Sequence, residues 1–317
     1  MFHVIINPAC GSGRGRQNRR VLKQLMDQAK ITYIEHPTSS AGHVTRITRS
    51  ITDRRLYENN ATCNNLLLIG GDGTLNHCIN GIDDLEHTTL TYLPSGTSND
   101  FSRSLKLSEA PSKAIAAAGR HGKTTQIDIP NVSYGTKKRR FAVSSGIGYD
   151  AAVCDEVLRS PLKEPLNRIG LGKLVYAAVA LKQFLFLRPC GCDLYLDDEP
   201  PIRFDTFLLA AFMNLKHEGG GFPFAPDADF NDGKLDICLV GNLSKWAVPF
   251  ILPFVLLGRH YGKPGVHHYR ASRIRIVTDR PLCTHTDGEI LGNQKQLLYT
   301  CGDEKLLIRR PVRTNVI

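Results

Sequence analysis

The sequence predicts two domains of different class: an N-terminal α/β domain built on a parallel sheet, and a second domain that is an antiparallel β-sandwich. Up to about residue 120, short apolar runs alternate with segments of helical periodicity, which is the pattern of repeated βα units. Beyond residue 123, strand-like runs follow one another with Gly, Pro and Asp between them. We therefore expect the α/β domain at 1–123 and the sandwich at 124–317, with a C-terminal tail that could return to the first domain.

The elements of the first domain follow from the spacing of its apolar residues. The run 66–69 reads Leu-Leu-Leu-Ile and ends at two glycines, which is typical of a strand buried on both faces. Between 17 and 30, apolar residues recur at helical spacing. In chain order we expect strand 4–6, helix 17–30, strand 32–35, helix 44–51, strand 66–69, a helix through Leu75 and Ile79, strand 90–93, and helices 98–105 and 110–120.

The second domain reads as a series of strands with few helical crossovers, which favours antiparallel pairing. The basic run Lys-Lys-Arg-Arg at 137–140 follows a turn sequence, so we interpret it as a solvated hairpin tip and expect no nucleic-acid partner. Strands are expected at 125–129, 140–144, 192–196, 203–212, 235–240, 272–278 and 296–300.

The charge balance and the cysteines narrow the class of protein. Lys and Arg number 40 against 30 Asp and Glu, which gives a formal net charge of +10. Such an excess favours anionic partners: nucleotide phosphates, nucleic acid or an acidic membrane surface. The nine cysteines form no CxxC pair and no Cys/His cluster with metal-ligand spacing. We therefore expect a reduced cytoplasmic protein without a zinc site or a disulfide framework.

Two apolar segments, 174–187 and 246–257, are the candidates for membrane contact. Each is shorter than the roughly 20 apolar residues of a membrane-spanning helix, and the N-terminus lacks the secretory pattern. Basic residues flank the second segment, among them Arg259 and Lys263, and such a rim suits an anionic membrane surface. Packing within the protein explains this segment equally well. We expect a cytoplasmic protein that attaches transiently to the inner face of the membrane.

Three glycine-rich turns lie at strand-to-helix junctions of the first domain. The first reads Asn-Pro-Ala-Cys-Gly-Ser-Gly at 7–13, and four arginines follow within 14–20. It lacks both the Gly-Lys-Ser/Thr of a Walker A loop and the spacing of GxGxxG. A plain turn and a phosphate cradle both remain open for this segment.

The second turn reads Gly-Gly-Asp-Gly-Thr-Leu-Asn at 70–76, and the third reads Pro-Ser-Gly-Thr-Ser-Asn-Asp at 94–100. Small residues at a helix start let backbone N–H groups approach a phosphate. A carboxylate there, Asp72 or Asp100, would repel a polyphosphate unless a divalent cation lies between them. Capping of the helix explains Asp72 alone equally well, but two acidic residues at neighbouring turns favour Mg²⁺ bound with a nucleotide.

The second and third turns together resemble the diacylglycerol kinase catalytic-domain family, the soluble lipid kinases that include bacterial diacylglycerol kinases and sphingosine kinases. Gly-Gly-Asp-Gly-Thr is followed about 20 residues later by Pro-x-Gly-Thr-x-Asn-Asp-Phe, and this pair is specific. The resemblance implies an NAD kinase/diacylglycerol kinase-like fold with ATP in the interdomain cleft. Other matching pieces are Gly-Ile-Gly-Tyr-Asp-Ala at 146–151, Gly-Gly-Gly-Phe at 219–222, Asn-Asp-Gly-Lys-Leu-Asp at 231–236 and Asp-Gly-Glu at 287–289.

The resemblance also implies roles in the nucleotide site. Asp72 and Asp100 would face the phosphates and Mg²⁺. Cys10 stands where the family has a small or hydroxyl residue, and His77 replaces a common Glu, which puts details of these contacts in doubt. The residues implied to line the ATP site are Asn7, Pro8, Ala9, Cys10, Gly11, Thr38, Gly71, Asp72, Gly73, Thr74, Leu75, Asn76, His77 and Thr97.

The Asp-Gly-Glu motif of the second half is implied to act in catalysis. Taken alone, Asp287-Gly288-Glu289 also has the pattern of a hairpin turn. Phosphoryl transfer to an alcohol needs a base near the hydroxyl. The resemblance implies that Glu289 is this base, with Asp287 positioning it or tuning its pKa through a neighbouring like charge.

A structural metal is implied further along the second half. Residues 227–238 match only the opening of an EF-hand, so by themselves they indicate a turn before a strand. The resemblance instead implies a structural Mg²⁺ held by the Asp232 carboxylate and the backbone carbonyls of Asp229 and Lys234.

The sequence thus predicts an ATP- and Mg²⁺-dependent lipid kinase that phosphorylates the hydroxyl of a membrane lipid, with diacylglycerol as the leading acceptor. An NAD kinase-like enzyme and a catalytically inactive basic lipid-binding protein are the alternatives. A sphingoid base, an isoprenoid alcohol and phosphatidylglycerol remain open as acceptors. The oligomeric state is open as well, a homodimer included.

Overall fold

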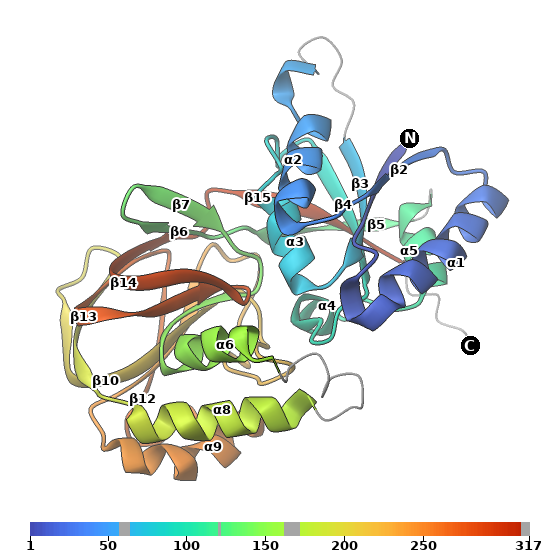
Figure 1. Cartoon of the computed structure of the whole chain (residues 1–317). Coiled ribbons are helices and arrows are strands. Elements are labelled where there is room, and N and C mark those ends of the chain that lie inside the picture. Colours follow the sequence, from blue (N-terminus) through green and yellow to red (C-terminus); the bar gives the residue numbers. More distant parts are fainter. Residues whose placement is uncertain (57–63, 120–121, 162–171, 312–317) are drawn as a thin grey trace, which may run out of the picture. The chain divides into compact units, whose positions relative to one another are not determined.

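The computed structural model describes residues 1–56, 64–119, 122–161 and 172–311, which divide into two units. The first unit is residues 1–129 together with the chain from Asp303 onward, and the second unit is residues 130–302 (Figure 1). The division falls after residue 129 and not after 123, because the strand expected at 125–129 pairs with a C-terminal strand of the first sheet.

The described part of the first unit contains a six-stranded sheet in the order β2-β1-β3-β4-β15-β5. Neighbouring strands are parallel from β2 through β15, and only the edge strand β5 runs antiparallel. The predicted parallel sheet is confirmed, and the C-terminal tail, which we expected could return to this domain, extends it as β15. The strands are β1 (Phe2–Ile6), β2 (Tyr33–Pro37), β3 (Asn64–Gly70), β4 (Thr88–Pro94), β5 (Lys123–Asp128) and β15 (Lys305–Arg310).

Helices cover both faces of this sheet (Figure 1). On one face α1 packs against α5, and Leu22 and Met26 of α1 reach the core under β1 and β3. On the other face α2 packs against α3. Ser40 begins α2 as an N-cap, since its Oγ accepts the His43 N–H over 3.3 Å. The helices are α1 (Arg14–Gln28), α2 (Ala41–Ile51), α3 (Asp72–Ile79), α4 (Asp100–Leu105) and α5 (Pro111–Ala118).

The described part of the second unit contains nine strands, and the pairings between them are antiparallel. Both β8 and β9 pair with β10 on one side and with β13 on the other, so the sheet folds back on itself as a sandwich. The strands are β6 (Asn131–Tyr134), β7 (Lys137–Arg140), β8 (Ser144–Gly148), β9 (Cys190–Leu196), β10 (Ile202–Met213), β11 (Leu235–Gly241), β12 (Val266–Ala271), β13 (Arg273–Thr286) and β14 (Glu289–Thr300).

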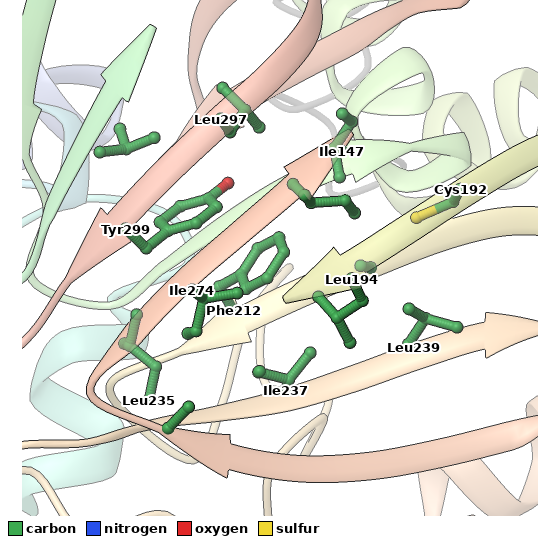
Figure 2. Packing of buried hydrophobic residues seen from close by; sticks show 14 of the residues in the cluster. Ile147, Cys192, Leu194, Phe212, Leu235, Ile237, Leu239, Ile274, Leu297 and Tyr299 are labelled. Carbon is green, nitrogen blue, oxygen red and sulfur yellow. The ribbon is translucent and has the colours of Figure 1, made fainter. Parts of the chain in front are cut away.

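One apolar core fills the interior of this sandwich. Figure 2 shows side chains from β8, β9, β10, β11, β13 and β14 pointing into it. Phe212 and Tyr299 stack at its centre with ring centroids 4.1 Å apart, and Phe141 meets Tyr299 edge to face. Alternate residues along β11, Leu235, Ile237 and Leu239, enter this core. The predicted antiparallel sandwich is therefore confirmed.

Within the described part of the second unit, the α-helices that accompany the sandwich are α6 (Tyr149–Arg159), α8 (Gly172–Phe186) and α9 (Val248–Leu256). The apolar segments at 174–187 and 246–257 form most of α8 and α9, which run side by side in Figure 1. Among the helices that the structure describes, none has the length and apolarity required to cross a membrane.

Candidate active site

The carboxyl ends of three parallel strands bring the three glycine-rich turns together. The turns follow β1, β3 and β4, and parallel strands end at the same edge of their sheet. A Cβ placed on Gly96 would lie 2.6 Å from the Gly71 Cα, and a Cβ on Gly11 would lie 2.1 Å from the Ser95 carbonyl oxygen. Gly11 also has a φ of +57°, which residues with a Cβ rarely adopt. Only glycine lets these turns pack backbone against backbone.

Amide side chains tie the turns to one another. Asn7 donates from Nδ2 to Thr74 Oγ1 over 2.9 Å, which joins the first turn to α3. Asn99, in the left-handed conformation, accepts the Gly96 N–H at Oδ1 over 3.0 Å and donates to the Gly96 carbonyl over 3.2 Å. Asn99 belongs to the third motif, yet we assigned it no role from the sequence. It fixes the conformation of the third turn.

Asp72 is the first residue of α3, but its carboxylate caps α4. Its Oδ2 accepts the Asp100 N–H over 2.9 Å and its Oδ1 accepts the Phe101 N–H over 3.4 Å. A negative acceptor at a helix N-terminus is favoured by the helix dipole. Each carboxylate oxygen can accept more than one bond, so capping leaves room for a cation on the accessible side of Asp72. Asp72 is thus a helix cap, as the alternative interpretation held, but it caps α4 and not α3.

The Asp100 side chain is less exposed to solvent than that of Asp72. The Asp100 side chain is 7% exposed, and Arg103 Nε lies 3.8 Å from its Oδ1. Asp72 is half-buried at the edge of the sheet. Of the two carboxylates implied to face phosphate and Mg²⁺, Asp72 is the one that a ligand can reach in this structure.

The other residues implied at the nucleotide site lie at the same edge of the sheet but differ in their exposure to solvent. Thr38 follows β2 and donates its hydroxyl to the Ile6 carbonyl over 2.9 Å. Burial raises the pKa of the Cys10 thiol to about 11, so Cys10 stays protonated at neutral pH. Ala9 and Thr97 are exposed; Asn7, Pro8, Cys10, Gly11, Gly71, Gly73 and His77 are half-buried; Thr38, Thr74, Leu75 and Asn76 are buried.

In the second unit, Glu289 begins β14 directly after a tight hairpin turn. Thr286 pairs with Glu289 across β13 and β14, and the two residues between them have φ values of +46° for Asp287 and +82° for Gly288. Two left-handed residues match the twist of the adjoining strands, and Asp-Gly is a favoured pair for such a turn. The hairpin interpretation of Asp-Gly-Glu is compatible with a functional one, because the turn presents Glu289 at a fixed position.

The Asp287 carboxylate binds backbone rather than its neighbour Glu289. Its oxygens accept the N–H groups of Ala142 and Val143 over 2.8 Å each, and that of Ser144 over 3.0 Å. The strand predicted at 140–144 is wrong for this reason: β7 ends at residue 140, and the N–H groups of Ala142 and Val143 go to a carboxylate instead of a neighbouring strand. Asp287 therefore fixes the hairpin to the start of β8.

A cluster that we did not predict lies next to this hairpin. Asp150 on the first turn of α6, Glu218 after β10 and His285 on β13 meet, with one ligand atom of each within 4.8 Å of the others. His285 Nε2 lies 3.1 Å from Glu218 Oε1 and 3.3 Å from Asp150 Oδ2. Each residue lies in or beside a matched motif, but nothing in the sequence indicates that the three converge.

Burial and charge act in opposite directions on this cluster. Burial lowers the pKa of His285, but the Glu218 and Asp150 carboxylates outweigh it and hold the pKa well above its ordinary value. Burial raises the pKa of Glu218, and the His285 ring offsets only part of this effect. In this cluster, burial therefore disfavours charge on the Glu218 carboxylate, while the two carboxylates favour charge on the His285 ring.

The residues implied to hold a structural Mg²⁺ are engaged otherwise. Asp232 forms an ion pair with Arg270, and its Oδ1 accepts the Lys234 N–H over 3.0 Å. Asp229 accepts the Asn231 N–H over 3.2 Å in a local turn. These bonds fit the turn interpretation. The implied donor set also includes the backbone carbonyls of Asp229 and Lys234, so the Mg²⁺ site stays a prediction.

Comparisons with known proteins agree with this architecture. Residues 1–132 match the model of the diacylglycerol kinase catalytic domain, and residues 142–301 match that of the YegS C-terminal NAD kinase beta sandwich-like domain. The diacylglycerol kinase of Bacillus subtilis (strain 168) is 25% identical over 291 residues, covering 91% of this chain and 89% of that protein. YtlR of the same strain is 27% identical over 294 residues, covering 92% and 94%.

A solved structure shares the fold over nearly the whole chain. It is that of a diacylglycerol kinase from Bacillus anthracis str. Sterne, with a TM-score of 0.72 at 22% identity, covering 97% of this chain and 95% of that one. The two matched models together account for both units. The chain belongs to the diacylglycerol kinase catalytic-domain family, in the form that carries a YegS-type β-sandwich as its second domain.

Proposed function

We propose that this protein is an ATP- and Mg²⁺-dependent lipid kinase that transfers the γ-phosphate of ATP to the hydroxyl of a membrane lipid, with diacylglycerol as the acceptor and phosphatidic acid as the product. The observation that carries the proposal is the meeting of three glycine-rich turns at the carboxyl edge of one parallel sheet. The acceptor rests on the relatives named diacylglycerol kinase, from Bacillus subtilis and Staphylococcus aureus among others.

The turns suit a polyphosphate for two physical reasons. Glycines at Gly11, Gly71 and Gly96 let the turns pack backbone against backbone, which gathers backbone N–H groups at one edge of the sheet. Helices α1 and α3 begin directly after the first two turns, so their positive ends add to the attraction for phosphate. When bound, Mg²⁺ would neutralise phosphate charge, and Asp72 is the accessible carboxylate placed to hold it. Asn7, Asn99 and the Asp72–α4 bonds keep the turns rigid before the ligand arrives.

Glu289 is the proposed general base. Its carboxylate takes the proton of the lipid hydroxyl while that oxygen attacks the γ-phosphorus, and the bond from phosphorus to the leaving ADP oxygen breaks. Asp287 acts through the backbone: by accepting three N–H groups it fixes the turn from which Glu289 emerges. Asp287 is therefore a positioning residue in this proposal.

A lipid acceptor requires contact with a membrane, and α9 supports the notion that the second unit supplies it. All nine residues of α9 are apolar or proline, and all are half-buried or exposed. Phe250 is 77% exposed and, on the adjoining 3₁₀ turn, Trp246 is 60% exposed. We call this the α8–α9 surface; its other exposed apolar members are Leu181, Leu185, Phe186, Leu252, Phe254, Leu256 and Leu257.

Basic residues lie within the α8–α9 surface. Lys245 donates to the carbonyls of Leu185 and Leu187 over 3.0 and 3.1 Å, which ties α9 to the end of α8. Lys263 lies over the Phe254 ring, with Nζ 4.0 Å from its centroid. Exposed aromatic and aliphatic side chains with amines among them suit the interface of an anionic bilayer. Val248 packs against buried Leu208 and Leu209, but Phe250, Leu252, Phe254 and Leu256 are exposed, so packing against the described residues does not account for these four side chains.

Label transfer from γ-labelled ATP tests the proposal directly. The protein is incubated with labelled ATP, Mg²⁺ and mixed micelles of diacylglycerol, a sphingoid base, an isoprenoid alcohol or phosphatidylglycerol, with NAD⁺ in a parallel reaction. We expect labelled phosphatidic acid, and none from the Glu289→Gln variant. Label in another lipid would retain the kinase and replace the acceptor. Label in NAD⁺ alone, or in none of the acceptors, would contradict the proposal.

A further inference from the structure

The cluster of Asp150, Glu218 and His285 has acceptor groups that the protein does not satisfy. Among the residues that the structure describes, buried Asp150 Oδ1 and Glu218 Oε2 have no hydrogen-bond partner. The Ser144 hydroxyl, in a residue that is 1% exposed, faces Glu218. Buried polar atoms without partners are costly, and carboxylate oxygens more so than neutral ones. These orphaned atoms indicate that something is bound between them.

The spacing of the donors suits a metal ion. Ligands at about 2.0–2.2 Å from a common ion, in tetrahedral or octahedral arrangement, lie roughly 2.9–3.5 Å from one another. His285 Nε2 lies 3.1 Å from one carboxylate and 3.3 Å from the other, within that interval. Gly146 keeps the position open: a Cβ there would lie 2.0 Å from Asp150 Oδ2 and 2.5 Å from His285 Nε2.

The charges favour a cation over a structural ion pair. His285 Nε2 lies between the two carboxylates, and its Nδ1 lies 3.4 Å from the Gly288 amide nitrogen. Even a protonated ring therefore balances only one of the two carboxylate charges. Among the described residues, His285 is the basic partner of both. A bound water could donate to two of the orphaned oxygens, but it would leave the charge uncompensated.

We propose that Asp150, Glu218 and His285 form a site for one divalent transition-metal ion, with Mn²⁺ or Zn²⁺ as the fitting class. One imidazole nitrogen with two carboxylates suits these ions better than Mg²⁺, which prefers oxygen ligands and water. The site is distinct from the nucleotide-linked Mg²⁺ of the proposed reaction and from the Asp232 turn. It does not depend on the lipid kinase proposal, because it concerns ion binding alone.

Metal binding at this site has a consequence for the neighbouring hairpin. A metal on Nε2 would change the charge of the ring, and the other ring nitrogen, Nδ1, lies 3.4 Å from the Gly288 amide nitrogen. Gly288 lies between Asp287 and Glu289. Ion binding would therefore change the surroundings of the turn that carries Glu289. The NMR signal of the Gly288 amide should shift when the ion binds.

Titration of chelator-treated protein with Mn²⁺ tests the site. We expect one tightly bound Mn²⁺ per chain by electron paramagnetic resonance, and a rise in Tm of about 5–10 °C at a free concentration 100 times the Kd. Glu218→Gln and His285→Gln should each weaken binding at least about tenfold. Asp232→Asn, at the competing acidic turn, is the matched control and should bind like the wild type. Binding that neither cluster variant weakens, or that only Asp232→Asn removes, would overturn the proposal.

A measurement on the wild-type protein keeps the test decisive if a cluster variant does not fold. Pulsed electron paramagnetic resonance of bound Mn²⁺ should show coupling to a directly coordinated histidine nitrogen, and the Gly288 amide signal should shift in nitrogen–hydrogen NMR spectra under diamagnetic Zn²⁺. Absence of bound Mn²⁺, or Mn²⁺ bound without nitrogen coupling, would contradict the site. Both readouts are independent of phosphoryl transfer, so failure of the lipid kinase proposal would leave this result unaffected.

Discussion

The edge of the first sheet and the hairpin end of the sandwich both hold turns in a fixed conformation, but the contacts that hold them differ. At the sheet edge, three turns pack through backbone, and glycines at Gly71 and Gly96 permit the contact. At the hairpin end, carboxylates hold the chain: Asp287 binds three N–H groups of the segment before β8. The first arrangement depends on the absence of side chains and the second on one side chain. Substitutions at the sheet edge should therefore act through steric clashes, and substitutions at the hairpin end through lost hydrogen bonds.

The largest effect is expected from Gly96→Ala. The added Cβ would lie 2.6 Å from the Gly71 Cα, so one turn must move. We expect ATP binding to be lost and the first unit to be destabilised by about 1–3 kcal/mol. Gly42→Ala in α2 is the control, since a Cβ there meets nothing within 4 Å and helix propensity favours alanine by about 1 kcal/mol. Calorimetric titration with ATP and thermal unfolding measure both quantities; equal ATP affinity in the two variants would refute the backbone cradle.

Glu289→Gln should lower kcat by about 10²–10⁴-fold while ATP affinity stays within a few-fold of wild type. Glutamine keeps the shape of glutamate but cannot take a proton at neutral pH. The measurement is kcat on dispersed diacylglycerol, with nucleotide binding titrated separately. A kcat within a few-fold of wild type would move the base to another residue.

Asp72→Asn should affect both activity and stability. The neutral side chain weakens the cap on α4 by about 1 kcal/mol and removes the negative charge available to Mg²⁺. We expect phosphoryl transfer to fall much further than this small loss of stability explains, with a raised Mg²⁺ requirement. Initial rates across a Mg²⁺ series decide the point, and a rate and Mg²⁺ dependence equal to wild type would reject a metal role for Asp72.

Asp287→Asn should act mainly on stability. An amide has only one acceptor oxygen and turns an N–H₂ group toward backbone N–H donors, so at least one of three bonds is lost. We expect a loss of about 1–3 kcal/mol in unfolding free energy and a modest fall in kcat. Urea unfolding compared with Glu289→Gln separates the two roles: an Asp287→Asn variant as stable as wild type would contradict the positioning role.

The smallest effect on the fold is expected from Phe250→Ser on the α8–α9 surface. Since Phe250 is 77% exposed, its loss should change stability by no more than about 0.5 kcal/mol. Flotation with anionic vesicles should fall several-fold, and salt should weaken wild-type binding further. Unchanged flotation, or equal recovery on neutral vesicles, would remove the membrane role; misfolding would show that the residue packs after all.

The sequence analysis succeeded where the signal is local and failed where it depends on distant partners. Apolar runs and glycine turns predicted the parallel sheet, the sandwich and the edge where the turns meet. The strand predicted at 140–144 failed because Asp287, far away in sequence, takes the N–H groups of that segment. For the same reason nothing in the sequence indicated that Asp72 binds the Asp100 N–H or that Asp232 pairs with Arg270. The return of the C-terminal tail to the first domain was expected, but strand β15 was not among the predicted strands, because its position depends on β4 and β5, which are distant in the chain.

The cluster of Asp150, Glu218 and His285 illustrates the same limit. Asp150 is part of a matched motif, Glu218 precedes one, and His285 lies two residues before another. No spacing rule links residues that come from a helix, a loop and a strand. Their convergence is a property of the folded sandwich, in which β8 and β13 pair directly.

Hydrogen–deuterium exchange with and without ATP and Mg²⁺ tests most directly the claim that the three glycine-rich turns form the nucleotide site. The account predicts slowed exchange of backbone amides at 7–13, 71–77 and 95–97 together when ATP–Mg²⁺ is added, because all three turns would contact one ligand. Gly96→Ala should abolish this protection. Protection confined to one turn, or found only in the sandwich, would contradict the central claim.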